Sequence, residues 1–155
     1  MAKKTVIGRK DKVDFPDFGL FNVPAKVDTG AYTSSIHCSY AEVEVLNKKK
    51  VLTIILLDPK HSLYTGKKYV FTEFKKKKIR VANGESEIRY IIKTHLQMFG
   101  KVYPTEVSLA KRREMKFPVL IGRKALAGKF IVDPGKYDLS FKHKKITQNP
   151  LTYLP

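Results

Sequence analysis

The chain has 155 residues, of which 31 are lysine or arginine and 14 are aspartate or glutamate, so its formal net charge is +17. Hydrophobic residues make up 43% of it, which excludes a disordered protein and indicates one folded domain over residues 1–155. A single cysteine excludes an intrachain disulfide, and the longest apolar run, at 51–57, is too short to span a membrane, so we expect a soluble cytoplasmic protein. The charge favours a polyanionic partner: nucleic acid, an acidic membrane surface or an acidic peptide.

The first element that carries a chemical signal is a short apolar strand that ends in Asp28-Thr29-Gly30-Ala31. A turn explains these residues simply, because turns favour Asp and Gly. A catalytic role is the alternative. Two carboxylates in contact share one proton, so that one acts as a base toward water and the other as an acid toward a carbonyl. The Thr29 hydroxyl would then brace the loop, and Gly30 would let the backbone turn tightly.

The middle of the chain has the periodicity of β-strands. Within 41–58, valines alternate with polar residues before a lysine-rich turn and an apolar run. Over 77–110, β-branched and aromatic residues alternate, with turn signals at Asn83-Gly84 and at Gly100. These segments predict hairpins of short strands.

The segment 117–133 reads as an apolar strand, then Gly122-Arg123, then a short helix. Within 122–129 the residues Lys-Ala-Leu-Ala favour a helix, and a glycine follows them as a stop signal. Helix is scarce elsewhere in the chain. We therefore predict an all-β domain of many short strands, as in a barrel or a sandwich, with one short helix near 123–128.

Metal and nucleotide chemistry find little support in the sequence. None of the histidines has a metal-binding spacing, and they are widely separated: His37, His61, His95 and His143. The segment 122–129 is one residue too long for a phosphate-binding loop, and Phe130 replaces the hydroxyl residue that would reach magnesium. We expect no metal and no other cofactor.

Two motifs together resemble the signature of retroviral-type aspartic proteases. They are Asp28-Thr29-Gly30-Ala31 and, late in the chain, the apolar strand followed by Gly122-Arg123. Three longer stretches, 7–38, 80–100 and 106–135, look like the bacterial retropepsin-like family that includes RimB. Members of this family are often labelled ATP-dependent zinc proteases. The resemblance implies a closed β-barrel of the acid protease fold and peptidase activity.

The resemblance also implies roles for individual residues. Asp28, Thr29 and Gly30 would form the catalytic loop. The residues that would contact substrate are Ala31, Tyr32, Arg123 and a flap tip at Asn83, Gly84 and Glu85. Any hairpin would use Asn-Gly, so a plain turn is the alternative for the flap. The chain has only one Asp-Thr-Gly, so a carboxylate dyad requires Asp28 from two subunits of a homodimer.

Two separate arguments, one from charge and one from the family resemblance, predict an acidic substrate. A cleft in a protein of charge +17 favours acidic peptides. RimB itself, in the resembled family, is linked to glutamate-ligase systems, where it trims glutamates added to a ribosomal protein. Arg123 is the first candidate to bind substrate carboxylates. In viral relatives the corresponding arginine pairs with an aspartate at the position that is Tyr32 here, so Arg123 could instead hold the loop through another acceptor.

Two other functions stay open. A basic β-barrel could bind RNA or an acidic ribosomal segment, with Asp28 as a turn residue and the aromatic residues of 67–80 as a stacking surface. A retropepsin-like domain could also be inactive. We expect no membrane partner. His37 and Cys38 are interpreted as core or loop residues. For Arg89, Arg112 and Arg113 we favour surface ion pairs with Glu87 or Glu114 over contacts with substrate.

Overall fold

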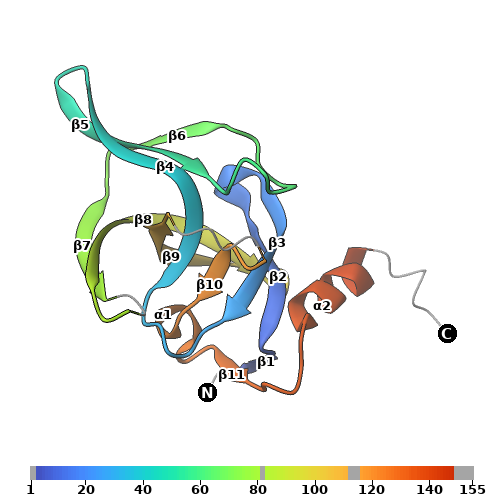
Figure 1. Cartoon of the computed structure of the whole chain (residues 1–155). Helices are drawn as coiled ribbons and strands as arrows, with labels where there is room; N and C mark the ends of the chain where they lie inside the picture. Colours follow the sequence, from blue (N-terminus) through green and yellow to red (C-terminus); the bar gives the residue numbers. More distant parts are fainter. Residues whose placement is uncertain (1–2, 81–82, 112–115, 149–155) are drawn as a thin grey trace.

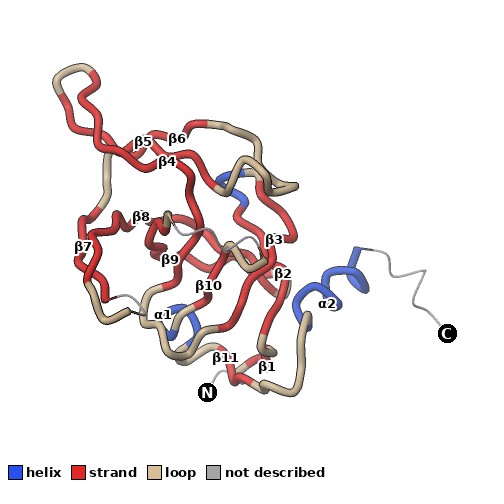
Figure 2. Tube along the Cα trace, in the orientation of Figure 1, coloured by secondary structure: helices blue, strands red, loops and turns tan. Residues whose placement is uncertain are grey.

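The computed structural model describes residues 3–80, 83–111 and 116–148, and most of them lie in strands (Figure 1 and Figure 2). The strands are β1 Thr5–Ile7, β2 Lys10–Phe15, β3 Leu20–Val27, β4 Ser34–Leu46, β5 Lys49–Leu56, β6 Lys68–Phe71, β7 Lys75–Arg80, β8 Ser86–Met98, β9 Lys101–Ala110, β10 Val119–Ile121 and β11 Phe130–Val132. The helices are the 3-10 turn η1 Pro16–Phe18, α1 Arg123–Leu126 and α2 Leu139–Gln148.

Six strands close into a barrel, in the order β10-β3-β2-β8-β9-β4, because β10 pairs with β4 as well as with β3. The β10–β3 and β4–β9 pairs are parallel, and the other pairs of the ring are antiparallel. Strands β5 and β6 extend the sheet beyond β4, and β7 pairs with β8. Strands β1 and β11 form a separate parallel pair. The prediction of an all-β closed barrel is confirmed.

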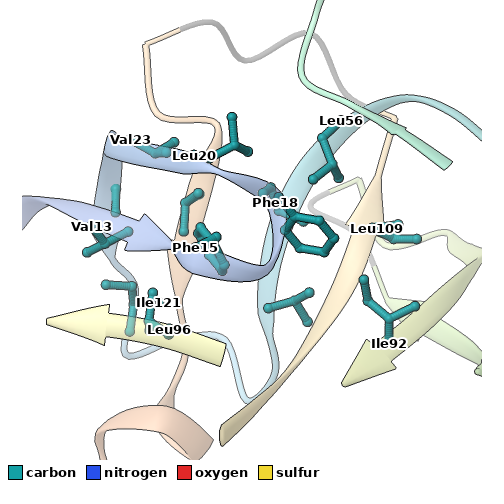
Figure 3. Packing of buried hydrophobic residues seen from close by; sticks show 14 of the residues in the cluster. Val13, Phe15, Phe18, Leu20, Val23, Leu56, Ile92, Leu96, Leu109 and Ile121 are labelled. Carbon is teal, nitrogen blue, oxygen red and sulfur yellow. The ribbon is translucent and has the colours of Figure 1, made fainter. Parts of the chain in front are cut away.

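The core lies inside this ring and follows from the alternation of side chains along each strand. In β3, Val23, Ala25 and Val27 are buried while Lys26 is exposed, which is the period of two that a half-buried strand requires. Figure 3 shows inward-facing side chains from several elements, among them Val13, Phe15, Val23, Ile92, Leu96, Leu109 and Ile121.

The predicted hairpin turns are confirmed. At the β8–β9 turn, Phe99 and Gly100 both have positive φ, 52° and 72°, as a two-residue type I′ turn requires. The Asn83-Gly84 signal lies between Arg80 and Ser86, which pair across β7 and β8. There Gly84 has φ 84°, and the Asn83 side chain accepts a hydrogen bond from the backbone N–H of Glu85 at 2.9 Å.

The helix expected near 123–128 is confirmed as α1, but the expectation of a single short helix was wrong. A second helix, α2, packs on the outside of the barrel against β2 (Figure 1). Its start is held by a residue far away in sequence. The buried carboxylate of Asp11 accepts hydrogen bonds from the backbone N–H groups of Ser140, at 2.9 Å, and Phe141, at 3.1 Å. No helix in the described part of the chain is long and apolar enough to cross a membrane.

Removing the Asp11 carboxylate is expected to destabilise the protein by releasing the start of α2. Burial raises the pKa of Asp11, because lost hydration outweighs the three backbone N–H donors of Lys12, Ser140 and Phe141. The cost of burying the charge therefore offsets part of what these hydrogen bonds contribute. We expect Asp11→Ala to lower the free energy of unfolding in urea by about 1–3 kcal/mol. Far-UV circular dichroism should show a loss of helix.

The control is Asp58→Ala, which removes a carboxylate that accepts a hydrogen bond from Lys60 within an exposed turn. We expect this variant to lose less than about 1 kcal/mol and no helix. Equal losses in the two variants would mean that the Asp11 carboxylate does not anchor α2.

Candidate active site

The loop that carries Asp28 begins directly after β3 and is folded into a tight turn. The Asp28 N–H donates to the carbonyl of Ile121 at 2.9 Å, which continues the β3–β10 pairing. One oxygen of its half-buried carboxylate accepts the N–H of Gly30 at 3.1 Å. The Asp28 carbonyl accepts the N–H of Ala31 at 3.2 Å. The carboxylate is therefore held in place by the main chain around it.

The segment after β10 holds this loop from behind. The N–H of Arg123 donates to the carbonyl of Ala31 at 2.8 Å, and the N–H of Lys124 donates to the carbonyl of Tyr32 at 2.9 Å. These are N–H groups of the first turn of α1, which have no acceptor within the helix. The loop thus supplies the acceptors that the start of the helix needs.

Gly122 permits this close approach. A Cβ at this position would lie 2.7 Å from the Tyr32 carbonyl oxygen and 2.9 Å from the Thr33 carbonyl carbon. Both are backbone atoms, so no larger residue fits without a shift of the loop. The N–H of Gly122 also donates to the hydroxyl of the buried Ser34 at 3.0 Å.

The Arg123 side chain lies against the same loop. Its Nη1 donates to the carbonyl of Thr29 at 2.8 Å, and its guanidinium carbon is 5.8 Å from the centre of the Tyr32 ring. A main-chain carbonyl is thus the acceptor for this arginine, where Tyr32 offers no carboxylate. The guanidinium has five N–H donors, so this contact does not preclude a second one with substrate.

The residues interpreted as a flap tip form the exposed end of a hairpin. Asn83, Gly84 and Glu85 are exposed at the end of the β7–β8 hairpin, and a Cβ at Gly84 would meet no atom within 4 Å. Figure 1 draws this end of the hairpin at the same lower end of the barrel as the loop after β3. Within the described part of the chain, no hydrogen bond joins these three residues to the Asp28 loop.

Other residues that the sequence singles out lie elsewhere in the structure. His37 and Cys38 are buried in β4. Burial raises the pKa of the Cys38 thiol to about 11, so this residue is not an activated nucleophile. Arg89 forms an ion pair with Glu87. Arg112, Arg113 and Glu114 lie outside the described residues.

The aromatic residues of 67–80 pack inward. Tyr69 and Phe71 contact Phe18, with ring centres 4.9 Å and 6.2 Å away, and Phe74 contacts Tyr90 at 5.9 Å. All five rings are partly or fully covered by other residues. They do not form the exposed stacking surface that single-stranded RNA binding would use.

The described residues do not fit the zinc site that the label of the resembled family implies. Among them, no three His, Cys, Asp or Glu side chains come together as a group that could hold a metal ion. A structural zinc site takes four such ligands, and a catalytic one takes three.

Sequence reasoning missed two parts of the site. One is Ser34, whose hydroxyl supports Gly122; the small hydroxyl residues that follow Tyr32 were the available signal. The other is a cluster of cations around Lys26, which precedes Asp28 by two residues. Only the lysine close to the motif could have indicated it, because the other members come from distant segments.

Comparison with known proteins places most of the chain in one family. A model described as RimB-like, retropepsin-like aspartic endopeptidase RimB, matches residues 6–143. Two similar proteins, from Shewanella pealeana and Desulfotalea psychrophila, are each named probable alpha-L-glutamate ligase. They are 33% identical over 137 residues and 32% identical over 138 residues, and each match covers 86% of this chain. The chain spans only 29% of the length of these two relatives.

A solved structure shares the fold. The crystal structure of a Legionella pneumophila protein of unknown function matches with a TM-score of 0.68, at 22% sequence identity. The match covers 89% of this chain and 99% of that one. At this level of identity the likeness concerns the fold alone.

Proposed function

The chain belongs to the RimB-like family of retropepsin-like aspartic endopeptidases, and on that premise we propose that it is an aspartic peptidase acting on glutamate-rich peptides or tails of a protein substrate. One observation carries the proposal. Two main-chain groups of the Asp28-Thr29-Gly30 loop form hydrogen bonds with the segment around Gly122. The Asp28 N–H donates to the Ile121 carbonyl, and the Thr29 carbonyl accepts from the Arg123 side chain, so the loop is held at two points. A catalytic carboxylate needs such support, because a small misplacement of the reacting group costs rate.

The chemistry requires a second carboxylate, which the partner subunit of a homodimer would supply. In such a dyad one Asp28 is ionised and the other is protonated. The ionised group removes a proton from water as the water oxygen attacks the peptide carbonyl carbon, and the protonated group gives its proton to the carbonyl oxygen. When the tetrahedral intermediate collapses, the first Asp28 protonates the leaving nitrogen, the C–N bond breaks, and the second Asp28 recovers a proton from a hydroxyl.

The substrate class follows from charge and from the relatives. The chain has a formal charge of +17, which favours an acidic peptide near the cleft. Relatives that contain a similar segment are named glutamate ligases, and a ligase and a peptidase act on the same kind of bond in opposite directions. A protein with ligated glutamates, such as the ribosomal substrate linked to the family, is therefore the substrate we propose.

The test is the cleavage of a peptide with a C-terminal oligoglutamate tail, followed by mass spectrometry, with and without a chelator. The wild-type protein is compared with Asp28→Asn and with Asp58→Asn, an aspartate of an exposed turn. We expect cleavage by wild type and Asp58→Asn, no cleavage by Asp28→Asn, and no effect of the chelator. Cleavage that survives in Asp28→Asn would place the chemistry elsewhere. No cleavage by any of the three would favour a binding module or an inactive domain.

A further inference from the structure

A pocket of about 310 Å³ is lined almost entirely by cations. The described residues that line it are Arg9, Lys10, Lys26, Lys116 and Phe117, and we call it the basic pocket. None of these residues is acidic, although the chain has 14 aspartates and glutamates. Its volume is at the lower end of the range for small-ligand sites, about 300–1,000 Å³, so it suits a few side chains rather than a large ligand.

The basic pocket and the Asp28 loop share strand β3. Lys26 is the penultimate residue of β3, which ends at Val27, and Asp28 follows directly. Lys26 is exposed and Val27, between them, is buried. The N–H of Val27 donates to the carbonyl of Arg9 at 2.9 Å, so Arg9 lies beside the residue that precedes Asp28.

Phe117, the aromatic residue that lines the basic pocket, is also connected to the Asp28 loop. Phe117 leads into β10, whose last residue, Ile121, accepts the N–H of Asp28. In the β3–β10 register, Leu120 lies beside Lys26. Lys26 in β3 and Phe117, just before β10, therefore belong to the two segments that pair beside Asp28, whereas Arg9 and Lys10 come from the segment that leads into β2.

The cations of the basic pocket are placed where they repel one another. Lys10 and Lys26 are directly opposite in the antiparallel β2–β3 pair, an arrangement that is destabilising for like charges. Among the described residues, no carboxylate forms an ion pair with Arg9, Lys10 or Lys26. Arg9 and Lys10 instead lie over the ring of Tyr137, at 4.9 Å and 5.2 Å from its centre. Repulsion of this kind would be relieved by an anion that enters from outside.

We propose that the basic pocket binds the side-chain carboxylates of substrate glutamates next to the scissile bond, and that Lys26 and Arg9 determine the selectivity for acidic peptides. This inference rests on the proposed function, because it takes Asp28 as the catalytic residue. A guanidinium binds a carboxylate through two N–H groups, and Lys26 adds a point charge. Phe117 offers an apolar surface for the methylene groups of glutamate.

The proposal is tested by binding rather than by turnover, so that its failure is distinct from failure of the proposed function. The full-length Asp28→Asn protein is titrated in a calorimeter with an oligoglutamate peptide and with a matched oligoglutamine peptide. Lys26→Met and Arg9→Met are each added to this background. The matched control is Lys50→Met, which makes the same change of charge on β5, opposite Val45 in the β4–β5 hairpin.

We expect Lys26→Met and Arg9→Met each to weaken oligoglutamate binding about tenfold, the loss of one charge-assisted contact. Lys50→Met should change it less than twofold, and Lys26→Arg should keep most of it. Oligoglutamine binding should not respond to any of these substitutions. In proteins that retain Asp28, Lys26→Met should raise KM for the glutamate tail and leave kcat nearly unchanged.

Several outcomes would overturn the proposal even if wild type cleaves the peptide. They are no detectable oligoglutamate binding, equal weakening by Lys50→Met, and equal weakening of oligoglutamine binding. A single-stranded RNA that binds more tightly than oligoglutamate and is weakened by Lys26→Met would assign the basic pocket to nucleic acid instead. Binding that follows the expected pattern without any cleavage would refute the proposed function alone.

Discussion

An Asp28→Asn subunit is expected to inactivate a wild-type subunit with which it pairs. When wild-type chains are refolded with a ninefold excess of Asp28→Asn chains, random pairing leaves few dimers with two intact carboxylates. Activity per wild-type chain should then fall about tenfold, because only one wild-type chain in ten pairs with another. The expected effect follows from the proposed dyad, which takes one Asp28 from each subunit. The measurement is the initial rate of oligoglutamate cleavage at a constant amount of wild-type protein.

The control for this experiment is a ninefold excess of Asp28→Asn protein that is added after refolding and assayed before subunits exchange. This addition should leave the rate unchanged, since it competes only for substrate, which is present in excess. A rate that stays constant after joint refolding as well would mean that Asp28 acts within one subunit, and the dimeric dyad would be wrong.

Substitution of Gly122 by alanine is expected to damage both the fold and the activity. The added Cβ would lie 2.7 Å from the Tyr32 carbonyl oxygen and 3.0 Å from that of Ala31, and neither backbone atom can rotate away. The loop must shift, which breaks its hydrogen bonds with the start of α1. We expect a loss of about 2–4 kcal/mol in the free energy of unfolding and at least a hundredfold loss in kcat/KM.

Gly135→Ala is the matched control. A Cβ there would meet the Asp133 carboxylate oxygen at 3.3 Å, which is the far end of a side chain and can move. We expect this variant to stay within about 0.5 kcal/mol of wild type in urea unfolding and to keep full activity. If Gly122→Ala also unfolds like wild type and retains its rate, the contact between loop and helix does not position Asp28.

The parts of this protein that could be predicted from sequence are those with a local cause. The turn at Phe99-Gly100 and the hairpin at Asn83-Gly84 follow from which residues accept positive φ. The strand of β3 follows from the alternation of buried and exposed residues. Helix α1 follows from a short run of helix-forming residues with a glycine after it. In each case the residues that decide the structure are neighbours in the chain.

Helix α2 could not be predicted in this way. Its sequence, LSFKHKKITQ, includes several residues that favour helix only weakly, and its first N–H groups are satisfied by Asp11 in β2, more than a hundred residues away. The hydrogen-bond acceptor of the Arg123 side chain could not be predicted from the sequence either. Tyr32 indicated that a side-chain carboxylate was missing there, but only the folded loop presents the Thr29 carbonyl at 2.8 Å.

By itself the sequence determined which residue types are available for catalysis. They are an aspartate at the end of a strand, followed by Thr29 and Gly30, and a later Gly122-Arg123 pair. The order of these two motifs is typical of one family of peptidases. The tertiary structure decided what these residues touch. Closure of the barrel brings β10 beside β3, so that two motifs 94 residues apart share hydrogen bonds. The same closure gathers Arg9, Lys26 and Lys116 around one pocket. Contacts of this kind depend on strand pairing between distant segments, which no local pattern of residues encodes.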